Sequence, residues 1–324
     1  MKEPGSIRAE QYLAPETLAQ LASFELRAKM IVEGVMNGMH RSPYKGLAVE
    51  FAEHRQYVPG DETRHLDWKV FGRTDKLYLK QYQQETNLDV VLLVDSSGSM
   101  RYGSLGMKKG WGGTSASTGD SLWTKYDHAT ATSAALAHLC LQQRDRIGVS
   151  TFADGLGRKV RRSNNREQWR SVVHTLSEQP VDETINLVKM ADQVLSNITN
   201  RALFFIVSDF LCEEDEIKEC LARFKHRNHD VVLVQILDRQ ELEFTIQDAA
   251  PFEGLEGEGR VNVDPRAIRS TYLEILKAHQ RRVREISRSF GYEVETLNSH
   301  ESVGPPLARL FARRMSFSRK AGAR

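Results

Sequence analysis

The chain has 324 residues, of which 40% are hydrophobic and 27% are charged, and its 45 basic and 43 acidic residues leave a formal net charge of +2. These values are typical of a soluble globular protein, and the balanced charge excludes a generally basic nucleic-acid coat or an acidic disordered tail. No apolar run approaches the roughly 18–20 residues that a membrane-spanning helix needs. The three cysteines form no CxxC pair, as expected in a reducing compartment. We therefore expect a cytoplasmic protein with no membrane span and no nucleic-acid partner.

Residues 1–86 have a mixed pattern. Residues 14–38 carry apolar side chains at helical spacing, so the pattern predicts a helix there. Short strands are predicted at 47–53 and 76–82, with a polar, turn-forming stretch between them. Because these elements offer little apolar surface, we expect an N-terminal extension that packs with the rest of the chain as one compact unit.

From residue 87 onward, strands alternate with helices. Buried strands are predicted at 89–94, 146–152, 202–207, 231–237 and 292–297, and helices at 122–143, 166–176, 184–196, 213–226 and after Pro265. This order predicts an α/β domain over 87–300, built on a mostly parallel, doubly wound sheet. Residues 245–263 predict a hairpin or an ordered excursion, and 301–324 form a basic C-terminal tail.

An Asp-x-Ser-x-Ser sequence directly follows the first buried strand, and it contains Asp95, Ser97 and Ser99. In a doubly wound sheet, binding sites form beyond the carboxyl ends of the strands. One carboxylate and two hydroxyls are hard oxygen donors, which select Mg²⁺, Mn²⁺ or Ca²⁺ over zinc or copper. Asp209 follows another buried strand, and Thr184, at the expected start of a helix, offers a further hydroxyl. We predict a metal site formed by these five residues.

This set resembles the metal-ion-dependent adhesion site (MIDAS) of the von Willebrand factor A (vWA) domain, which has Asp-x-Ser-x-Ser on one loop, a Thr on the next and an Asp on the third. The resemblance implies a bound Mg²⁺, with Mn²⁺ or Ca²⁺ as alternatives, that accepts a carboxylate from a partner protein. The chain departs from the pattern at Asp182-Glu183-Thr184, where Gly-Gly-Thr is common. In the purely structural alternative, Asp95 caps a helix and the serines bond a turn.

A narrower resemblance covers nearly the whole chain. Residues 50–69 and 80–85 resemble the signature of the bacterial domain-of-unknown-function family fifty-eight, in which an N-terminal segment precedes a vWA-like domain. The resemblance implies a non-enzymatic adaptor that works with a MoxR-type AAA+ ATPase in protein-complex maturation or chaperoning. The client protein would then supply the carboxylate.

The signature mixes aromatic, turn-forming and charged residues. We expect a structural clasp, in which the chain turns at a Pro-Gly pair, an arginine pairs with a nearby carboxylate and the tryptophan packs on the main domain. A surface that docks a partner is the second option. The residues concerned are Tyr57, Pro59, Gly60, Asp61, Arg64, Asp67 and Trp68.

The alternative function is a metal-dependent phosphoester hydrolase that uses the same Asp/Ser cluster, with Asp95 as nucleophile or metal ligand. A haloacid-type phosphatase, however, would need a second Asp where Ser97 stands. The sequence also has no GxxxxGK[ST] phosphate-binding loop and no GxSxG turn for a nucleophilic serine. We therefore predict a binding module and no enzyme.

Overall fold

The computed structural model describes residues 49–58, 66–84, 88–106, 122–142, 144–165, 167–177, 180–181, 183–247, 250–257 and 259–301. Contacts divide these residues into two compact units, 49–84 and 88–301, where the sequence led us to expect one. The helix predicted at 14–38 and nearly all of the basic tail lie outside the described residues.

The smaller unit is an antiparallel pair of strands with a short helix between them. Strand β1 (Val49–Gln56) pairs with β2 (Tyr78–Gln84), and helix α2 (Trp68–Thr74) lies between them in sequence. Both strands were predicted, and both lie slightly nearer the C-terminus than expected. The sequence did not predict α2, because its polar surroundings favour turns over a helix.

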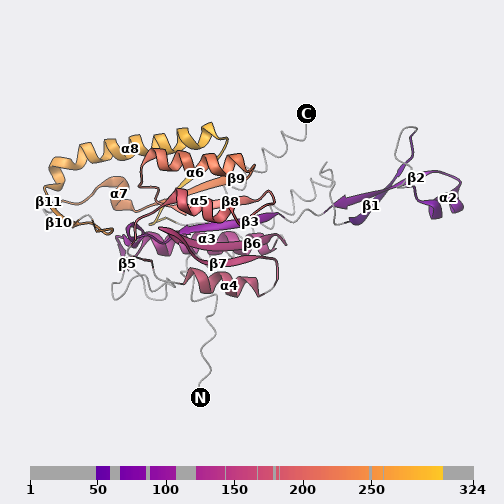
Figure 1. Ribbon diagram of the computed structural model, residues 1–324, viewed down its shortest axis with the longest axis horizontal. Coiled ribbons are helices and arrows are strands. Elements are labelled where there is room, and N and C mark those ends of the chain that lie inside the picture. The colour runs from indigo at the N-terminus through magenta and orange to yellow at the C-terminus, as the bar shows by residue number, and fades with distance from the viewer. Residues whose placement is uncertain are drawn as a thin grey trace, which may run out of the picture. The chain divides into compact units, whose positions relative to one another are not determined.

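The larger unit contains a six-stranded sheet in the order β12-β9-β8-β3-β6-β7. Its strands are β3 (Asp89–Asp95), β6 (Arg146–Ala153), β7 (Gly155–Ser163), β8 (Leu203–Ser208), β9 (Asp230–Leu237) and β12 (Glu293–Asn298). Neighbouring strands are parallel, except that β7 pairs antiparallel with β6. The predicted doubly wound α/β fold is confirmed (Figure 1).

Helices cover both faces of this sheet. They are α3 (Lys125–Gln142), α4 (Gln168–Leu176), α5 (Leu187–Leu195), α6 (Glu214–His226), α7 (Arg239–Glu243) and α8 (Pro265–Ser289). Apolar residues of α3 and α4 form one core, and those of α5, α6 and α8 form a second core on the opposite face. Every residue of β3 and β8 is buried, which explains why their sequences are continuous apolar runs.

Several elements of the larger unit differ from the prediction, among them the helix predicted at 122–143, which begins at Lys125 after a short strand at 122–123. Helix α5 begins at Leu187, where the Asn186 side chain accepts a hydrogen bond from the Lys189 N–H, so Thr184 lies in the segment before the helix. Strand β7 was not predicted, because as an edge strand it exposes many basic residues and reads as polar. The five-residue helix α7 was also missed, although Asp238 and Glu241 form a capping box at its start.

Smaller elements lie near the carboxyl ends of the strands. Strand β4 (Leu105–Gly106) pairs with β5 (Leu122–Trp123), and a short 3₁₀ helix covers Gly98–Arg101. Strands β10 (Ala250–Glu253) and β11 (Arg260–Val263) pair antiparallel, which confirms the hairpin predicted within 245–263.

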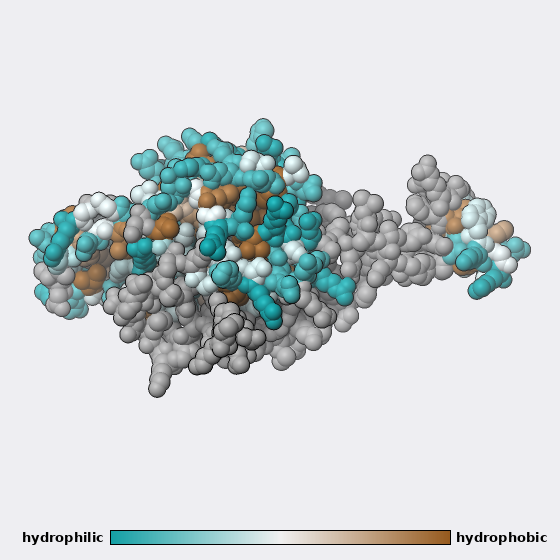
Figure 2. Space-filling view, turned by 60° about the horizontal axis from the view of Figure 1, so that its bottom comes forward, coloured by the Kyte–Doolittle hydropathy of each residue, from teal (hydrophilic) through white to brown (hydrophobic). Residues whose placement is uncertain are grey.

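Hydrophilic residues dominate the visible surface of the described part, and hydrophobic residues form small groups between them (Figure 2). Among the described residues, no helix combines enough length with enough apolar side chains to cross a membrane.

Candidate metal site

The candidate site lies where the order of the sheet reverses. From β3 the chain first builds β6 and β7 on one side of the sheet, and then β8, β9 and β12 on the other. The carboxyl ends of β3 and β8 therefore lie side by side, as in other open α/β sheets that bind ligands at this point. Asp95 is the last residue of β3, and Asp209 follows directly after β8. Both side chains are buried.

The loop after β3 brings its carboxylate and hydroxyl groups together. Asp95 Oδ1 accepts a hydrogen bond from the Ser97 N–H at 2.8 Å, and its Oδ2 accepts one from the Ser208 hydroxyl at 2.6 Å. The hydroxyl oxygens of Ser97 and Ser99 lie 3.2 Å apart. The carboxylate thus bonds the turn itself, whereas in the purely structural alternative it caps a helix and the serines bond the turn. The two hydroxyls, however, face each other, and Ser97 makes no side-chain cap of the 3₁₀ helix.

The segment before α5 runs beside this loop. The Val181 N–H donates to the Ser96 carbonyl at 2.8 Å, and the Gly98 N–H donates to the Glu183 carbonyl at 3.1 Å. These bonds place Val181 and Glu183 next to the Asp-x-Ser-x-Ser loop. The side chain of Thr184 is itself exposed.

A buried lysine, which the sequence reasoning missed, neutralises Asp209. Lys125 is the first residue of α3 and is 1% exposed. Its Nζ lies 2.8 Å from Asp209 Oδ2 and 2.7 Å from Glu241 Oε1. Burial alone would lower the pKa of Lys125, but the two carboxylates outweigh burial and raise it above its usual value. A lysine is unfavourable in the first turn of a helix, and this was the one sequence signal that it has acidic partners.

The two aspartates differ in their electrostatic surroundings. Burial and the nearby charge of Asp209 raise the pKa of Asp95 to about 7. Burial would also raise the pKa of Asp209, but the Lys125 ammonium holds it below its usual value. The charge of Asp209 is therefore compensated within the chain, whereas among the described residues it is hydrogen-bond donors, Ser97 and Ser208, that stabilise ionised Asp95.

The turn after β8 is held in an unusual backbone conformation. Phe210 has a φ of 53°, which is rare for a bulky residue. Its N–H donates to the Ser208 hydroxyl at 2.9 Å, and its carbonyl accepts a hydrogen bond from His279 Nε2 at 2.7 Å. Strain of this kind persists only where the surroundings impose it, and it occurs often at functional sites.

Three of the five predicted residues, Asp95, Ser97 and Ser99, fit a hard divalent cation. Two cis ligands of an octahedral Mg²⁺ at about 2.1 Å stand about 3.0 Å apart, close to the 3.2 Å between the two serine hydroxyls. A cation there would also stabilise the ionised form of the buried Asp95 carboxylate. Within the described residues, no three His, Cys, Asp or Glu side chains gather as a metal site on their own, so the hydroxyls would have to complete it. Asp209 fits less well, because the Lys125 ammonium already compensates its charge.

Comparison with known proteins identifies the family. Residues 53–282, more than half of the chain, match the family described as "Protein of unknown function DUF58". The chain belongs to this family. Uncharacterized proteins of Mycobacterium tuberculosis and Mycobacterium bovis are each 25% identical to this DUF58 protein over 318 residues, which cover 95% of this chain and 92% of theirs.

Solved structures of similar fold include proteins described as vWA domains. The conserved hypothetical protein BatB from Bacteroides thetaiotaomicron is 11% identical, with a TM-score of 0.46, and the match covers 71% of this chain and 98% of BatB. A von Willebrand factor type A protein from Catenulispora acidiphila is 10% identical, with a TM-score of 0.37, and the match covers 73% of this chain and 44% of that protein.

The signature residues of this DUF58 protein fall in the smaller unit. The Tyr57 N–H donates to the Leu77 carbonyl at 2.9 Å, and the Asp67 carboxylate caps α2. Trp68 is 64% exposed and meets the Phe71 ring edge to face. Its packing on the main domain stays a prediction, since the placement of the two units is not determined. Pro59, Gly60, Asp61 and Arg64 lie outside the described residues.

A second polar cluster lies near the site but lacks the geometry of a catalytic triad. The Ser104 hydroxyl donates to Asp238 and lies 2.9 Å from His300 Nε2. Asp238 also approaches His300 at Nε2, the same nitrogen, instead of bonding its far side. A Ser-His-Asp triad needs the carboxylate on the other ring nitrogen, so that the histidine can accept the serine proton. This cluster therefore gives no support to a hydrolase.

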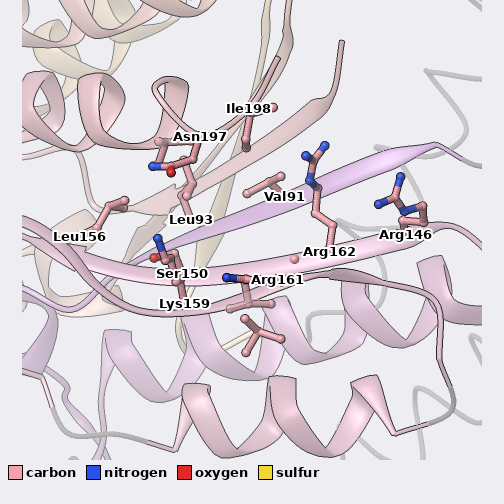
Figure 3. A pocket seen from close by; sticks show the side chains of 14 residues that line it. Val91, Leu93, Arg146, Ser150, Leu156, Lys159, Arg161, Arg162, Asn197 and Ile198 are labelled. Carbon is pink, nitrogen blue, oxygen red and sulfur yellow. The ribbon is translucent and has the colours of Figure 1, made fainter. Parts of the chain in front are cut away.

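A cavity of about 420 Å³ lies elsewhere on the sheet, between β6, β7 and the end of α5 (Figure 3). Apolar side chains such as Val91 and Ile198 line it together with basic ones, among them Arg146 and Arg162. Both arginines pair with Asp89. The cavity contains none of the predicted site residues, so we assign it no part in metal binding.

Proposed function

We propose that this protein is a non-enzymatic binding module that holds a divalent cation and recognises a carboxylate of a partner protein. The paired hydroxyls of Ser97 and Ser99, beside the buried carboxylate of Asp95, carry this proposal. They stand at the switch point of the sheet, the place where open α/β sheets bind their ligands.

The proposed ion-holding residues are Asp95, Ser97 and Ser99, with Thr184 and Asp209 as neighbours that act directly or through water. Mg²⁺ is the preferred ion, because it favours oxygen ligands and keeps several of its waters. Mn²⁺ and Ca²⁺ are alternatives. The bound ion supplies an electrophilic centre at which a carboxylate can replace water. Two neutral hydroxyls contribute no negative charge to that centre, which preserves its attraction for an incoming anion.

The proposed partners are a MoxR-type AAA+ ATPase and a client protein that offers the carboxylate. Two resemblances support this role in protein-complex maturation or chaperoning. Residues 50–69 and 80–85 resemble the family signature, and the Asp-x-Ser-x-Ser loop resembles a MIDAS. The interaction should weaken in EDTA and in the Asp209→Ala variant, which can be measured by pulling down the ATPase with the full chain. An interaction indifferent to both changes would remove the metal from recognition.

Calorimetry with Mg²⁺ tests the metal site directly. The wild type should bind the ion, the double variant Asp95→Ala, Ser97→Ala should not, and a variant at the exposed Ser196, Ser196→Ala, should bind as the wild type does. Equal binding by the wild type and the double variant would refute the assignment. A screen with phosphate esters on the same proteins tests the alternative, and turnover lost in Asp95→Asn would make the protein a hydrolase.

A further inference from the structure

The β10–β11 hairpin places a glutamate of the same chain against the candidate site. The Ser99 N–H donates to Glu256 Oε1 at 3.0 Å. Glu256 lies in the turn that joins the two strands, 157 positions along the chain from Ser99. A carboxylate oxygen of this protein is therefore bonded to the backbone of one of the two serines proposed to hold the ion.

The hairpin turn also packs tightly on the metal motif. A Cβ atom added to Gly98 would overlap the carbonyl oxygen of Leu255 and would lie 3.1 Å from Glu256 Cγ. Only glycine at this position allows the turn to approach so closely. Close to the turn, the Phe252 ring of β10 stacks on Phe244, with ring centroids 6.4 Å apart. A contact beside the turn thus supports the hairpin, and the turn itself rests on the loop.

A cation at this site would attract the Glu256 carboxylate. Asp95 and Asp209 already place two buried carboxylates at this end of the sheet, and Glu256 brings a third to the backbone of Ser99. A divalent cation at Asp95, Ser97 and Ser99 would favour the charged form of each of these carboxylates.

We propose that Glu256 is an internal ligand of this site, which occupies the position of the partner's carboxylate until the partner displaces it. This inference rests on the proposed function and names the chemistry of the partner. The partner would then offer an acidic side chain on a tight turn, which is the chemistry that Glu256 has in the Gly-Leu-Glu-Gly turn.

An internal ligand lowers the apparent affinity for an external one. A tethered group acts at an effective concentration of about millimolar order. The observed affinity for a competitor then falls in proportion to the fraction of molecules in which the site is open, so a site that is open about one-tenth of the time binds about tenfold more weakly. Removing Glu256 should restore the full affinity.

The test uses the full chain as wild type, as Glu256→Ala and as Glu253→Ala, an exposed acid on the same hairpin. The probe is a synthetic peptide with the sequence of residues 251–260, added with Mg²⁺, and a second peptide has Gln in place of Glu256. Glu256→Ala should bind the first peptide about tenfold or more tightly than the other two proteins do, and it should not bind the second. Equal affinity of the wild type and Glu256→Ala for the first peptide would overturn the proposal.

Two further readouts separate this inference from the function on which it rests. Hydrogen exchange at the Ser99 amide should be faster in Glu256→Ala than in the wild type or Glu253→Ala, since that amide loses its acceptor. Calorimetry with Mg²⁺ alone should show binding by all three proteins. If none of them binds Mg²⁺, the proposed function and this inference both fail. If all bind Mg²⁺ but peptide affinity and Ser99 exchange are unchanged in Glu256→Ala, the internal ligand alone is refuted.

Discussion

Replacing Lys125 with methionine should destabilise the protein, and Mg²⁺ should restore part of the loss. The Lys125 ammonium lies between Asp209 and Glu241, at 2.8 and 2.7 Å from their oxygens, and is 1% exposed. Methionine has a similar length but no charge, so Lys125→Met leaves two carboxylates in a buried position without their cation. It is therefore the charge, and not the packing, that this substitution removes.

The expected cost follows from the burial of the group. Removing one partner of a buried ion pair costs about 3–5 kcal/mol, because the remaining charge is left without compensation. The start of α3 regains about 0.3–1 kcal/mol when the positive charge leaves its first turn. We therefore expect the free energy of unfolding in EDTA to fall by about 2–5 kcal/mol, measured by urea denaturation. Mg²⁺ should stabilise Lys125→Met more than the wild type, because Asp209 is then free to interact with the ion.

Lys189→Met is the matched control. Lys189 Nζ lies 3.0 Å from Asp154, but the two side chains are 46% and 48% exposed, so this ion pair should contribute less than about 1 kcal/mol. If Lys125→Met lowers the free energy of unfolding no more than Lys189→Met does, the buried ammonium does not stabilise the charge of Asp209. If Lys125→Met loses stability but gains nothing extra from Mg²⁺, then Asp209 takes no part in the metal site.

Three further outcomes follow from the same surroundings. In EDTA, the pKa of Asp95 is raised to about 7 by burial and by Asp209, so its ionisation weakens the fold as pH rises from about 4 through 7. Urea unfolding should therefore show Asp95→Asn more stable than the wild type above pH 7, by up to about 4 kcal/mol, and the gap should close near pH 4. Ser208→Ala removes a hydrogen bond to Asp95 and should weaken Mg²⁺ binding about 10- to 100-fold in calorimetry, whereas Ser196→Ala should not. Asp67→Ala removes the cap of α2 and should cost that helix about 1 kcal/mol, seen as faster amide exchange within it and not elsewhere.

Local sequence patterns predicted the main sheet well, because its central strands are buried on both faces. The apolar runs of β3 and β8 could form only a covered parallel sheet, and the position of Asp95 and Asp209 after those runs placed both at one edge. Strand β7 escaped prediction for the opposite reason. It lies at the edge of the sheet, so its outward residues meet solvent, and basic side chains there resemble a loop.

The electrostatic partners of the site could not be predicted from local patterns. Lys125 and Asp209 are 84 positions apart, and no spacing rule connects the first residue of an Ala-rich helix to the turn after a distant strand. Thr184 shows a related limit. Its polar neighbours suggested the start of a helix, but Asn186 provides the cap and the helix begins later. The start of a helix depends on which polar side chain caps its first N–H groups. Several polar residues in a row can each act as that cap, so the sequence does not show which one does.

The contacts that build the site also set the order in which it can form during synthesis. Asp95 can form its hydrogen bond with Ser208 only after 113 further residues have been synthesised, and Ser99 can bond Glu256 only after 157. Lys125 likewise has no Asp209 to pair with until 84 further residues have been made. Contacts so distant in sequence form slowly, because a long stretch of chain must first be ordered. A growing chain therefore carries the motif without Ser208 until 113 further residues have been made, and without Glu256 for longer still. The hairpin that carries Glu256 is synthesised after both Asp95 and Asp209. During that interval the newly made site lacks the Glu256 carboxylate that we propose as its internal ligand.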